Sequence, residues 1–439
     1  MRLVILGGGG FRVPLVHRAL AARPELGVDQ LVLHDVDPGR LHVIAAVLPP
    51  VPGLRVLTTT DLPEALTGAD FVFSAVRVGG AAGRVRDERR ALELGVLGQE
   101  TVGAGGLAYG LRTLPVVRAA ALLQAELAPR AWLINFTNPA GLITQGLLPV
   151  LGDRVIGICD SPIGLIRRSC RALGVPETAV TADYLGINHL GWLRRLTMAD
   201  TDLLPGLLAD PARLGSFEEG RLLGDVAGSL GALPNEYLYF FYRARELTAQ
   251  LAGGSTRGEV VRDEQEEFYR AAANPDSDPA ALWRRSRERR EESYLAEARG
   301  AQERDRQDLS GGGYEHVALD LIQALSGGPP AELIVNARNG SAYPHLPAEL
   351  VLETRCLVDS DGARVVPGAM PDLHQLGLIA SVRAAEAAVV AAVEEGSRAQ
   401  AERAFAIHPL VGSWELASRL VDSLLADHPA LAGVLCVPD

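Results

Sequence analysis

In the first 160 residues, short apolar runs alternate with helical patterns. The apolar runs have the length of buried strands and lie at residues 3–6, 31–35, 71–76, 131–139 and 155–160. The helical patterns lie between them, at residues 11–22, 61–66 and 114–127. Such alternation is typical of β-α-β units and predicts an α/β fold with a Rossmann-like parallel sheet.

The pattern changes after residue 160. A strand is expected at residues 182–187, and further strands near residues 333–335 and 350–352. Alanine-rich helical patterns cover residues 376–404 and 413–425, and a stretch dense in arginine and glutamate covers residues 284–306. That stretch is expected to be a solvated helix face with i,i+4 ion pairs. We therefore expect two domains, a Rossmann-like domain over residues 1–160 and a C-terminal α+β domain over residues 161–439.

The first apolar run ends in a turn of four glycines. No side chain there blocks the approach of a pyrophosphate, and the N–H groups of the next helix would face that anion. The second run ends at Asp35, where a Rossmann fold places its ribose-binding carboxylate. This acidic residue favours NAD over NADP, although Arg40 nearby leaves NADP open. The residues predicted to bind the dinucleotide are Gly7, Gly8, Gly9, Gly10, Phe11, Asp35 and Arg40.

Composition and charge restrict the function classes. With 48% hydrophobic residues and a net charge of -12, the chain is globular and lacks the basic surplus of nucleic-acid-binding proteins. All 42 basic residues are arginine, which excludes Schiff-base lysine chemistry. The four scattered cysteines suggest no disulfide framework. Since neither a signal peptide nor a run of transmembrane length is recognised, we expect a cytoplasmic protein without a membrane partner.

Two side chains near strand ends are candidate metal ligands. Cys159 lies at the end of the run at residues 155–160, and His189 follows the strand expected at residues 182–187. A thiolate and an imidazole would leave coordination positions for water or substrate oxygens. The common alternatives are an inert buried cysteine and a core histidine with its hydrogen bonds satisfied.

Short motifs that occur in a fixed order carry a family resemblance over essentially the whole chain. They include Arg77-Val78-Gly79-Gly80, Gly98-Gln99-Glu100-Thr101, Asn135-Phe136-Thr137-Asn138-Pro139, Cys159-Asp160-Ser161-Pro162, Asn188-His189-Leu190, Pro234-Asn235-Glu236-Tyr237 and Thr256-Arg257-Gly258-Glu259. Together these motifs resemble glycoside hydrolase family 4, the NAD- and metal-dependent glycosidases, and especially its 6-phospho-β-glucosidase branch. The family is an exception to hydrolysis by two carboxylates.

The resemblance implies hydrolysis of 6-phospho-β-glucosides through a transient oxidation. In the family, bound NAD takes a hydride from carbon 3 of the sugar, and the resulting ketone acidifies the hydrogen on carbon 2. A divalent metal, usually manganese, polarises that carbonyl. A base removes the carbon-2 proton, the aglycone leaves, water adds, and the hydride returns to the sugar.

The same resemblance implies roles for individual residues. Cys159 and His189 would bind the metal, and Tyr237 would be the carbon-2 base. Asp160 would be the general acid for the leaving oxygen. The expected substrate-binding residues are Asn138, for sugar hydroxyls, and Arg84 and Arg257, for the 6-phosphate.

Several alternatives stay open at this stage. Tyr239 and Tyr242 lie close to Tyr237 and are alternative bases, and Asn138 could instead cap the chain at the following proline. Because many β-acting relatives carry asparagine at the position of Asp160, a 6-phospho-α-glucosidase or a glycosidase of non-phosphorylated substrates is the alternative within the family. Outside the family, the alternative is a 2-hydroxy-acid dehydrogenase, because lactate and malate dehydrogenases share the predicted layout. Relatives usually form homodimers or homotetramers, and we expect the same here.

Overall fold

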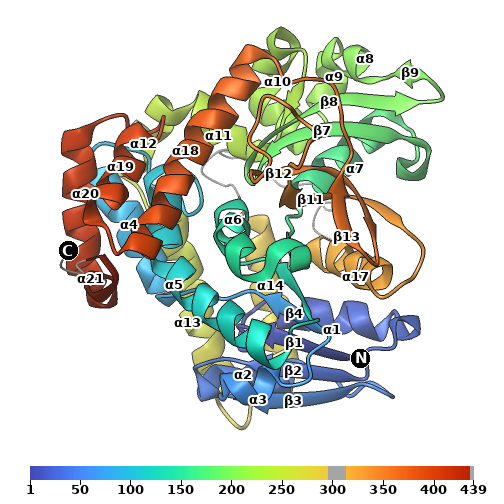
Figure 1. Ribbon diagram of the computed structural model, residues 1–439, viewed down its shortest axis with the longest axis vertical. Helices are drawn as coiled ribbons and strands as arrows, with labels where there is room; N and C mark the ends of the chain where they lie inside the picture. Colours follow the sequence, from blue (N-terminus) through green and yellow to red (C-terminus); the bar gives the residue numbers. More distant parts are fainter. Residues whose placement is uncertain (295–312, 436–439) are drawn as a thin grey trace.

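The structure, a computed structural model, describes residues 1–294 and 313–435 (Figure 1). The strands of the first half are β1 (Arg2–Leu6), β2 (Gln30–His34), β3 (Arg55–Thr59), β4 (Phe71–Ser74), β5 (Trp132–Asn135) and β6 (Val155–Gly157). They are parallel and lie in the order β3-β2-β1-β4-β5-β6. This is the strand order of a dinucleotide-binding Rossmann fold, so the predicted fold class is confirmed.

The strands of the second half extend the same sheet with antiparallel pairs. They are β7 (Thr181–Ile187), β8 (Leu190–Met198), β9 (Thr201–Asp202), β10 (Leu233–Pro234), β11 (Ala331–Arg338), β12 (Val351–Asp359) and β13 (Gly362–Val365). β11 joins the two halves by pairing Asn336 with Gly157 of β6. Over the described residues the result is a single sheet of thirteen strands. The sheet therefore continues past residue 160, and the division into two domains there stays a prediction.

Helices cover both faces of the parallel half. One face carries α3 (Leu62–Leu66), α5 (Gly103–Leu127), α6 (Ala140–Leu151), α18 (Leu373–Glu395), α19 (Arg398–Ile407), α20 (Trp414–Asp427) and α21 (Pro429–Leu435). The other carries α1 (Val13–Ala21), α2 (Pro38–Val47), α13 (Arg257–Ala272), α14 (Pro279–Glu292) and α17 (Tyr314–Leu325). Alternate side chains of β1 join the two cores, Val4 and Leu6 one core and Leu3 and Ile5 the other. Burial on both faces explains why this strand is a continuous apolar run.

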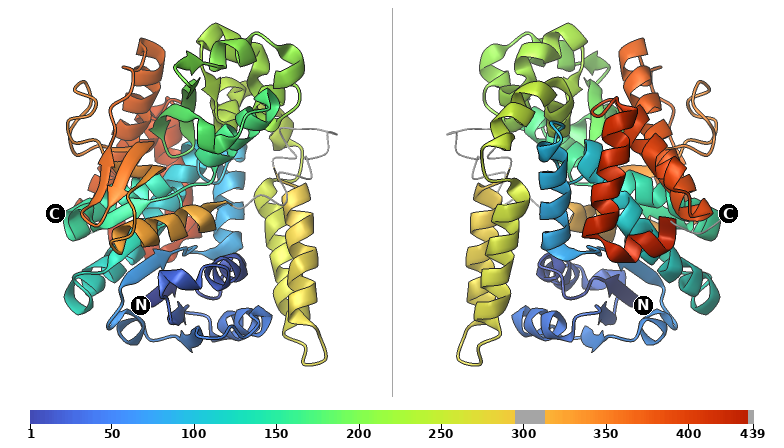
Figure 2. Two further views of the ribbon diagram at one scale, coloured as in Figure 1. Left: turned by 90° about the vertical axis from the view of Figure 1, so that its right-hand side faces the viewer. Right: turned by 90° about the vertical axis from the view of Figure 1, so that its left-hand side faces the viewer.

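The remaining helices lie beside the sheet edge or around the antiparallel strands. They are α4 (Gly80–Glu93), α7 (Ser161–Leu173), α8 (Leu204–Leu208), α9 (Pro211–Leu214), α10 (Glu218–Leu230), α11 (Tyr239–Tyr242) and α12 (Ala244–Ala252), with short 3-10 turns at Pro24–Leu26, Gly152–Arg154, Glu177–Ala179 and Glu236–Leu238. Figure 2 shows α13 and α14 as a pair of long helices standing beside the N-terminal half. In that pair α13 contacts α4, and α14 contacts α2. The pair therefore brings residues beyond 256 next to the Rossmann-like half.

The observed elements differ from the expected ones mainly where glycine intervenes. The helix expected at residues 114–127 begins at Gly103, because buried glycines in its first turns hide the helical pattern from the sequence. The pattern at residues 376–404 is two helices, separated at Gly396, which has the left-handed φ of 66°. The charged helix ends at Glu292, and residues 295–306 of the expected stretch lie outside the described residues.

Helix α18 corrects the expectation that the chain has no run of transmembrane length. By length and composition it is long and apolar enough to cross a membrane, and it is the one such helix among the described residues. However, it packs against α5, α6 and α19 inside the protein. Midway along it, buried Arg383 forms an ion pair with Glu386. These contacts are those of a core helix.

Candidate active site

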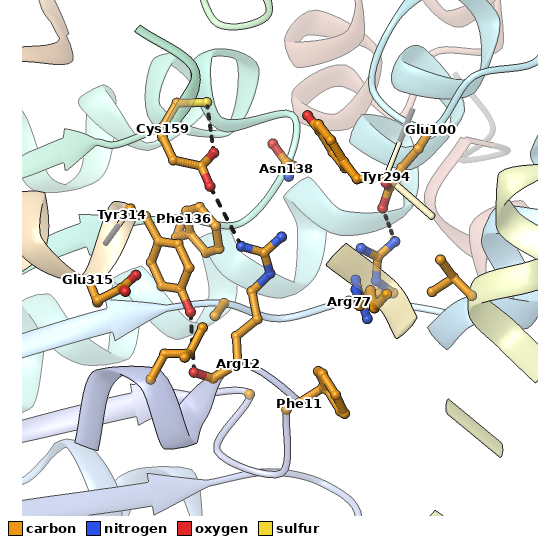
Figure 3. Close-up of a pocket in the computed structure, with 18 of the residues that line it drawn as sticks. Phe11, Arg12, Arg77, Glu100, Phe136, Asn138, Cys159, Tyr294, Tyr314 and Glu315 are labelled. Atoms are coloured by element: carbon orange, nitrogen blue, oxygen red, sulfur yellow. Dashed lines mark hydrogen bonds and ion pairs between the residues drawn. The ribbon is translucent and has the colours of Figure 1, made fainter. Parts of the chain in front are cut away.

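A cleft of about 300 Å³ opens at the carboxyl ends of the parallel strands. Its walls include the glycine turn after β1, the segments that follow β4, β5 and β6, and side chains from α4, α13 and α14. Figure 3 shows Arg12 and Phe11 rising from the glycine turn, with Cys159 on one side and Arg77 and Glu100 on the other. Parallel α/β sheets bind their ligands at this edge.

The glycine turn is tightly closed by its own backbone. The N–H groups of Gly7 and Gly8 both donate to His34 O, at 2.9 and 2.7 Å, and the N–H of Gly10 donates to Gly7 O at 2.9 Å. Gly7 has a φ of +85°, and a Cβ there would lie 2.6 Å from Ala75 O. Of the predicted nucleotide-binding residues, Gly7, Gly10, Phe11 and Arg40 line the cleft. Gly7 and Gly10 thus present their backbone to the cleft, whereas Gly8, Gly9 and Asp35 are not among its lining residues.

Asp35 and Arg40 flank this turn. The Asp35 carboxylate accepts hydrogen bonds from the N–H of Gly9 at 3.0 Å and from the N–H of Asp37 at 3.1 Å. The guanidinium of Arg40 lies over the ring of Tyr269, 4.7 Å from its centroid, and 3.6 Å from the Asp37 carboxylate. The predicted ribose-binding carboxylate is therefore fixed directly beside the glycine turn.

The two predicted metal ligands, Cys159 and His189, are buried and line the same cleft. Burial and the carboxylates of Glu353 and Asp160 raise the pKa of the Cys159 thiol well above its usual range, and the thiol donates to Asp160 at 3.9 Å. His189 Nδ1 lies 2.7 Å from the Thr101 hydroxyl, so Nε2 is left for another partner. Burial lowers the pKa of His189 to about 3, which keeps the imidazole neutral, the form that binds metals.

This donor set fits a metal held at two protein positions. The described residues contain no cluster of three or more His, Cys, Asp or Glu side chains with metal-site geometry. A cation at Cys159 and His189 would therefore need water or substrate oxygens to complete its shell. The two-point site expected from the sequence stays a prediction.

Tyr237 is stacked directly on His189, with ring centroids 3.6 Å apart and an interplanar angle of 8°. Its hydroxyl accepts a hydrogen bond of 3.2 Å from Tyr294. Burial, followed by the charges of Glu236 and Cys159, raises the pKa of Tyr237 well above its usual value. Tyr239 and Tyr242 are not among the lining residues, and the Tyr242 hydroxyl instead accepts from the Trp192 indole at 3.1 Å. Of the three candidate tyrosines, the structure brings Tyr237 to the cleft.

Asp160 lines the cleft beside an arginine that the sequence analysis missed. The guanidinium of Arg12 lies 3.8 Å from the Asp160 carboxylate and over the rings of Phe136 and Tyr314, 5.4 and 5.1 Å from their centroids (Figure 3). Arg12 comes directly after the glycine turn and Phe11, and this position in the sequence could have identified it as a residue of the site. The predicted general acid therefore has a cation as its neighbour.

Asn138 also lines the cleft, and its side chain points into it (Figure 3). The alternative role, capping the chain at the following proline, belongs to another residue. At the start of α6 the N–H of Ala140 donates to the Asn188 side chain at 3.0 Å. The asparagine that precedes His189 therefore caps this helix, and Asn138 faces the ligand space.

The predicted phosphate-binding residues, Arg84 and Arg257, lie in the cleft within a larger group of arginines. Buried Arg84 donates to Glu88 at 2.7 Å and to Glu100 at 2.6 Å, and Arg77 forms an ion pair with the same Glu100. The arginines hold the pKa of the Glu100 carboxyl far below its usual range although the group is buried. Arg257 donates to the Ser293 hydroxyl at 2.6 Å and to the main-chain oxygen of Arg290 at 3.0 Å.

The charged helix α14 is only partly solvated, which corrects the interpretation of residues 284–306 as a solvated face. Arg284, Arg285 and Arg289 are exposed, but Arg287 and Arg290 line the cleft. Both follow buried Trp283 at helical spacings of i+4 and i+7, so that tryptophan marked the inward face. Arg77, Glu100 and Thr101 were also missed as individual residues, although they lie within the motifs quoted above.

The comparisons with known proteins agree with this arrangement. The family description "Family 4 glycosyl hydrolase" matches residues 2–175, and "Family 4 glycosyl hydrolase C-terminal domain" matches residues 184–411. The chain is 30% identical to a 6-phospho-beta-glucosidase of Escherichia coli, over 98% of this chain and 95% of that one. It is 26% identical to a 6-phospho-alpha-glucosidase of Leptotrichia buccalis, over 96% of each chain.

A solved structure has the same fold. The 6-phospho-beta glucosidase from Thermotoga maritima, solved with manganese, NAD+ and glucose-6-phosphate, gives a TM-score of 0.84 at 24% identity, over 98% of this chain and 99% of that one. The two family matches together cover the motifs, most of the sheet and most of the residues that line the cleft. This chain belongs to family 4 of the glycosyl hydrolases.

Proposed function

We propose that this chain hydrolyses 6-phosphoglucosides with NAD and a divalent metal, and that the β-anomer is its substrate. The observation that carries the proposal is the content of one cleft. The glycine turn, the Cys159 and His189 pair, Tyr237 and the arginine group come from separate parts of the chain and line the same space. A relative with 30% identity is named a 6-phospho-beta-glucosidase, which supports the same substrate class.

Each proposed cofactor has a set of residues that would hold it. The glycine turn, Phe11, Asp35 and Arg40 would hold NAD, and Cys159 with His189 would hold manganese or another divalent metal. When bound, NAD supplies reversible hydride transfer and the metal supplies Lewis acidity. Thr101 fixes the ring of His189 through its hydrogen bond to Nδ1, as outer partners of metal-binding histidines do.

The side chains of the protein would orient the sugar and move its protons. Arg84 and Arg257 would hold the 6-phosphate through the guanidinium fork, and Asn138 would orient the ring hydroxyls. Tyr237 would accept the carbon-2 proton. Because its ring is stacked on His189, a metal cation bound by that histidine would favour the phenolate form of Tyr237.

Asp160 is the residue that supports the α-anomer as the second candidate. Relatives of both anomeric types match the chain at similar identity, 30% and 26%. An aspartate suits proton donation to a poor leaving group, and the Asp160 carboxyl lies 3.8 Å from the Arg12 guanidinium. A good leaving group needs no acid, so the first test uses one.

The test is release of 4-nitrophenol from the 6-phospho-β-glucoside and its α-anomer, with and without NAD and manganese. We expect release from the β-anomer only when both additives are present, without net accumulation of NADH. Release from the α-anomer alone would reassign the specificity. Full activity without nucleotide would contradict the mechanism, and stoichiometric NADH from a 2-hydroxy acid would favour a dehydrogenase.

Further parts of the proposal concern assembly and location. We propose a cytoplasmic homodimer or homotetramer, since phosphorylated disaccharides arise inside the cell during sugar uptake. Residues 1–160 would form the NAD-binding domain, and residues 161–439 the domain for substrate, metal and assembly. A phosphorylated glycoside, rather than nucleic acid or a membrane, is the proposed partner.

A further inference from the structure

Arg290 lies near the end of α14, on the wall of the cleft. Within residues 1–294 and 313–435, its guanidinium makes no hydrogen bond or ion pair. Other arginines of this wall are engaged, since Arg77 and Arg84 share Glu100 and Arg257 donates to Ser293. Arg290 therefore brings to the cleft a charge with which no described side chain pairs.

The position of this guanidinium is fixed by the helix that carries it. Its central carbon lies 5.6 Å from the centroid of the Phe11 ring, directly after the glycine turn. Phe11 in turn packs on Phe268 of α13 and Trp283 of α14, with centroids 5.3 and 5.8 Å away. The Trp283 indole also donates to Phe11 O at 2.7 Å. These contacts hold α14 against the turn, so Arg290 is a fixed part of the ligand space.

The charges around Arg290 are mostly of its own sign. Burial and the guanidinium groups of Arg12, Arg77 and Arg257 lower the pKa of Arg290 to about 9. Glu100 opposes this effect, but its carboxylate already pairs with Arg77 and Arg84. This wall thus holds surplus positive charge, and an anion beside it would offset the repulsion.

We propose that Arg290 binds a phosphoryl group of a ligand held in this cleft. A guanidinium stacked on a ring keeps its N–H edge free, and that edge matches the paired oxygens of a phosphate. Two sources supply this chemistry: the diphosphate of the dinucleotide, which the turn beside Phe11 would bind, and the sugar phosphate, which Arg257 would bind. Arg257 donates to the main-chain oxygen of Arg290, and the ring of Phe11 lies under its guanidinium, so a residue proposed to hold each source is a direct neighbour. The inference rests on the proposed function for the identity of these two ligands.

The test compares Arg290→Met with Arg289→Met on the same helix. Arg289 is exposed and forms an ion pair with Glu267 at 3.2 Å, so its removal matches the loss of charge without touching the cleft. For each protein, calorimetry gives the Kd of NAD, and then the Kd of glucose 6-phosphate in the presence of NAD and manganese. Loss of a hydrogen bond to a charged group predicts a rise of about 10- to 100-fold in one Kd for Arg290→Met and less than about twofold for Arg289→Met.

The two measurements separate the sources. A weaker Kd for NAD identifies the diphosphate, and a weaker Kd for glucose 6-phosphate at saturating NAD identifies the sugar phosphate. If both constants equal those of Arg289→Met, the proposal is overturned. Should Arg290→Met not fold, Arg290→Lys decides, because it keeps the charge without the fork: partial loss of one affinity supports the proposal, and wild-type affinity for both ligands overturns it.

Failure of the proposed function gives a different result. If the wild-type protein binds NAD but hydrolyses neither anomer, the proposed function is wrong, and the two Kd measurements still decide the role of Arg290. If the wild-type protein hydrolyses the glycoside and Arg290→Met keeps both affinities, only the inference about Arg290 fails.

Discussion

The two ends of the cleft are lined by different kinds of ionisable side chain. The arginine end consists of Arg77, Arg84, Arg257 and Arg290, and the carboxylate of Glu100 pairs with the first two of them. The thiol end consists of Cys159, His189 and Tyr237, with the carboxyl groups of Asp160, Glu236 and Glu353 near them. At the arginine end, burial and like charges lower the pKa of Arg290 to about 9. At the thiol end, burial and nearby carboxylates raise the pKa values of Cys159 and Tyr237.

The difference shows how one cleft can suit two kinds of charged ligand. The arginine end would be relieved by an anion, and its guanidinium groups are already ionised for that purpose. The thiol end would be relieved by a cation, which favours thiolate and phenolate in place of the neutral groups. A phosphorylated sugar lying between the ends, with its phosphate at one and its hydroxyls at the other, would satisfy both. Separate substitutions at each end test this division.

The largest effect is expected for Cys159→Ser, at the thiol end. Removal of the thiolate ligand should lower metal-dependent glycoside cleavage by about 1,000-fold or more, because metal stabilisation supplies several kcal/mol. The Kd of NAD should stay within about twofold, since binding there depends on the glycine turn. Steady-state kinetics with manganese and calorimetry with NAD measure the two quantities.

Cys170→Ser is the matched control, because Cys170 is equally buried but packs in a separate core beside Leu165 and Tyr184. It should retain activity close to that of the wild-type protein. Equal loss of NAD binding and activity in Cys159→Ser would mean that this cysteine is structural, and the division between the two ends would then be wrong.

Tyr237→Phe should have the next largest effect, about 100-fold or more in kcat, as expected for loss of a general base. In deuterated water the wild-type enzyme should place deuterium at carbon 2 of the product sugar, and the variant should do so far more slowly. Tyr239→Phe is the control, since Tyr239 packs in the neighbouring hydrophobic core rather than along the cleft. A product from the wild-type enzyme that keeps protium at carbon 2 would remove Tyr237 from the reaction.

The parallel half of the fold could be predicted from the sequence because its strands are buried on both faces. The runs at residues 3–6 and 71–76 correspond to β1 and β4, and Asp35 directly follows β2. Strand β8 was not predicted, because its central residues Arg194 and Arg195 interrupt the apolar run. Pairing between β6 and β11 joins positions far apart in the chain, and no local pattern announces it.

For the candidate site, the sequence predicted residues that lie in motifs and missed those that act through distant contacts. Cys159, His189, Tyr237 and Arg257 were all expected, and all line the cleft. Arg290 was missed because its role depends on α14 packing against the glycine turn, nearly three hundred residues earlier. The pKa shifts were equally inaccessible, since they depend on burial and on charges brought together by folding.

A smaller effect is expected for Arg257→Ala, at the arginine end. Loss of a charge-assisted contact should raise the KM for the phosphorylated glycoside by about 10- to 100-fold, with little change for the unphosphorylated analogue. Arg262→Ala on the same helix is the control, because Arg262 pairs on the surface with Asp263 at 2.8 Å. Equal changes in KM for both substrates would show that Arg257 does not bind the phosphate. The arginine end would then not be identified as the phosphate-binding end by its positive charge.

The smallest effect is expected for Glu236→Gln, which should change how Tm depends on pH. It tests whether the thiol end disfavours negative charge. Burial and the charge of Glu219 raise the pKa of Glu236 to about 8, and its carboxyl accepts a hydrogen bond of 2.6 Å from Ser161. The folded protein therefore binds a proton more tightly than the unfolded chain, so this group stabilises the fold at pH 5 and loses that contribution as the pH rises through about 8. Glu236→Gln stays neutral and should remove the loss, so the fall in Tm between pH 5 and 8.5 should be about 2 °C smaller than in the wild-type protein.

Thermal denaturation with a chelator present measures this difference in Tm, with exposed Glu246→Gln as the control. Identical pH profiles for all three proteins would mean that Glu236 is ionised at neutral pH and that the thiol end accepts negative charge without a cation.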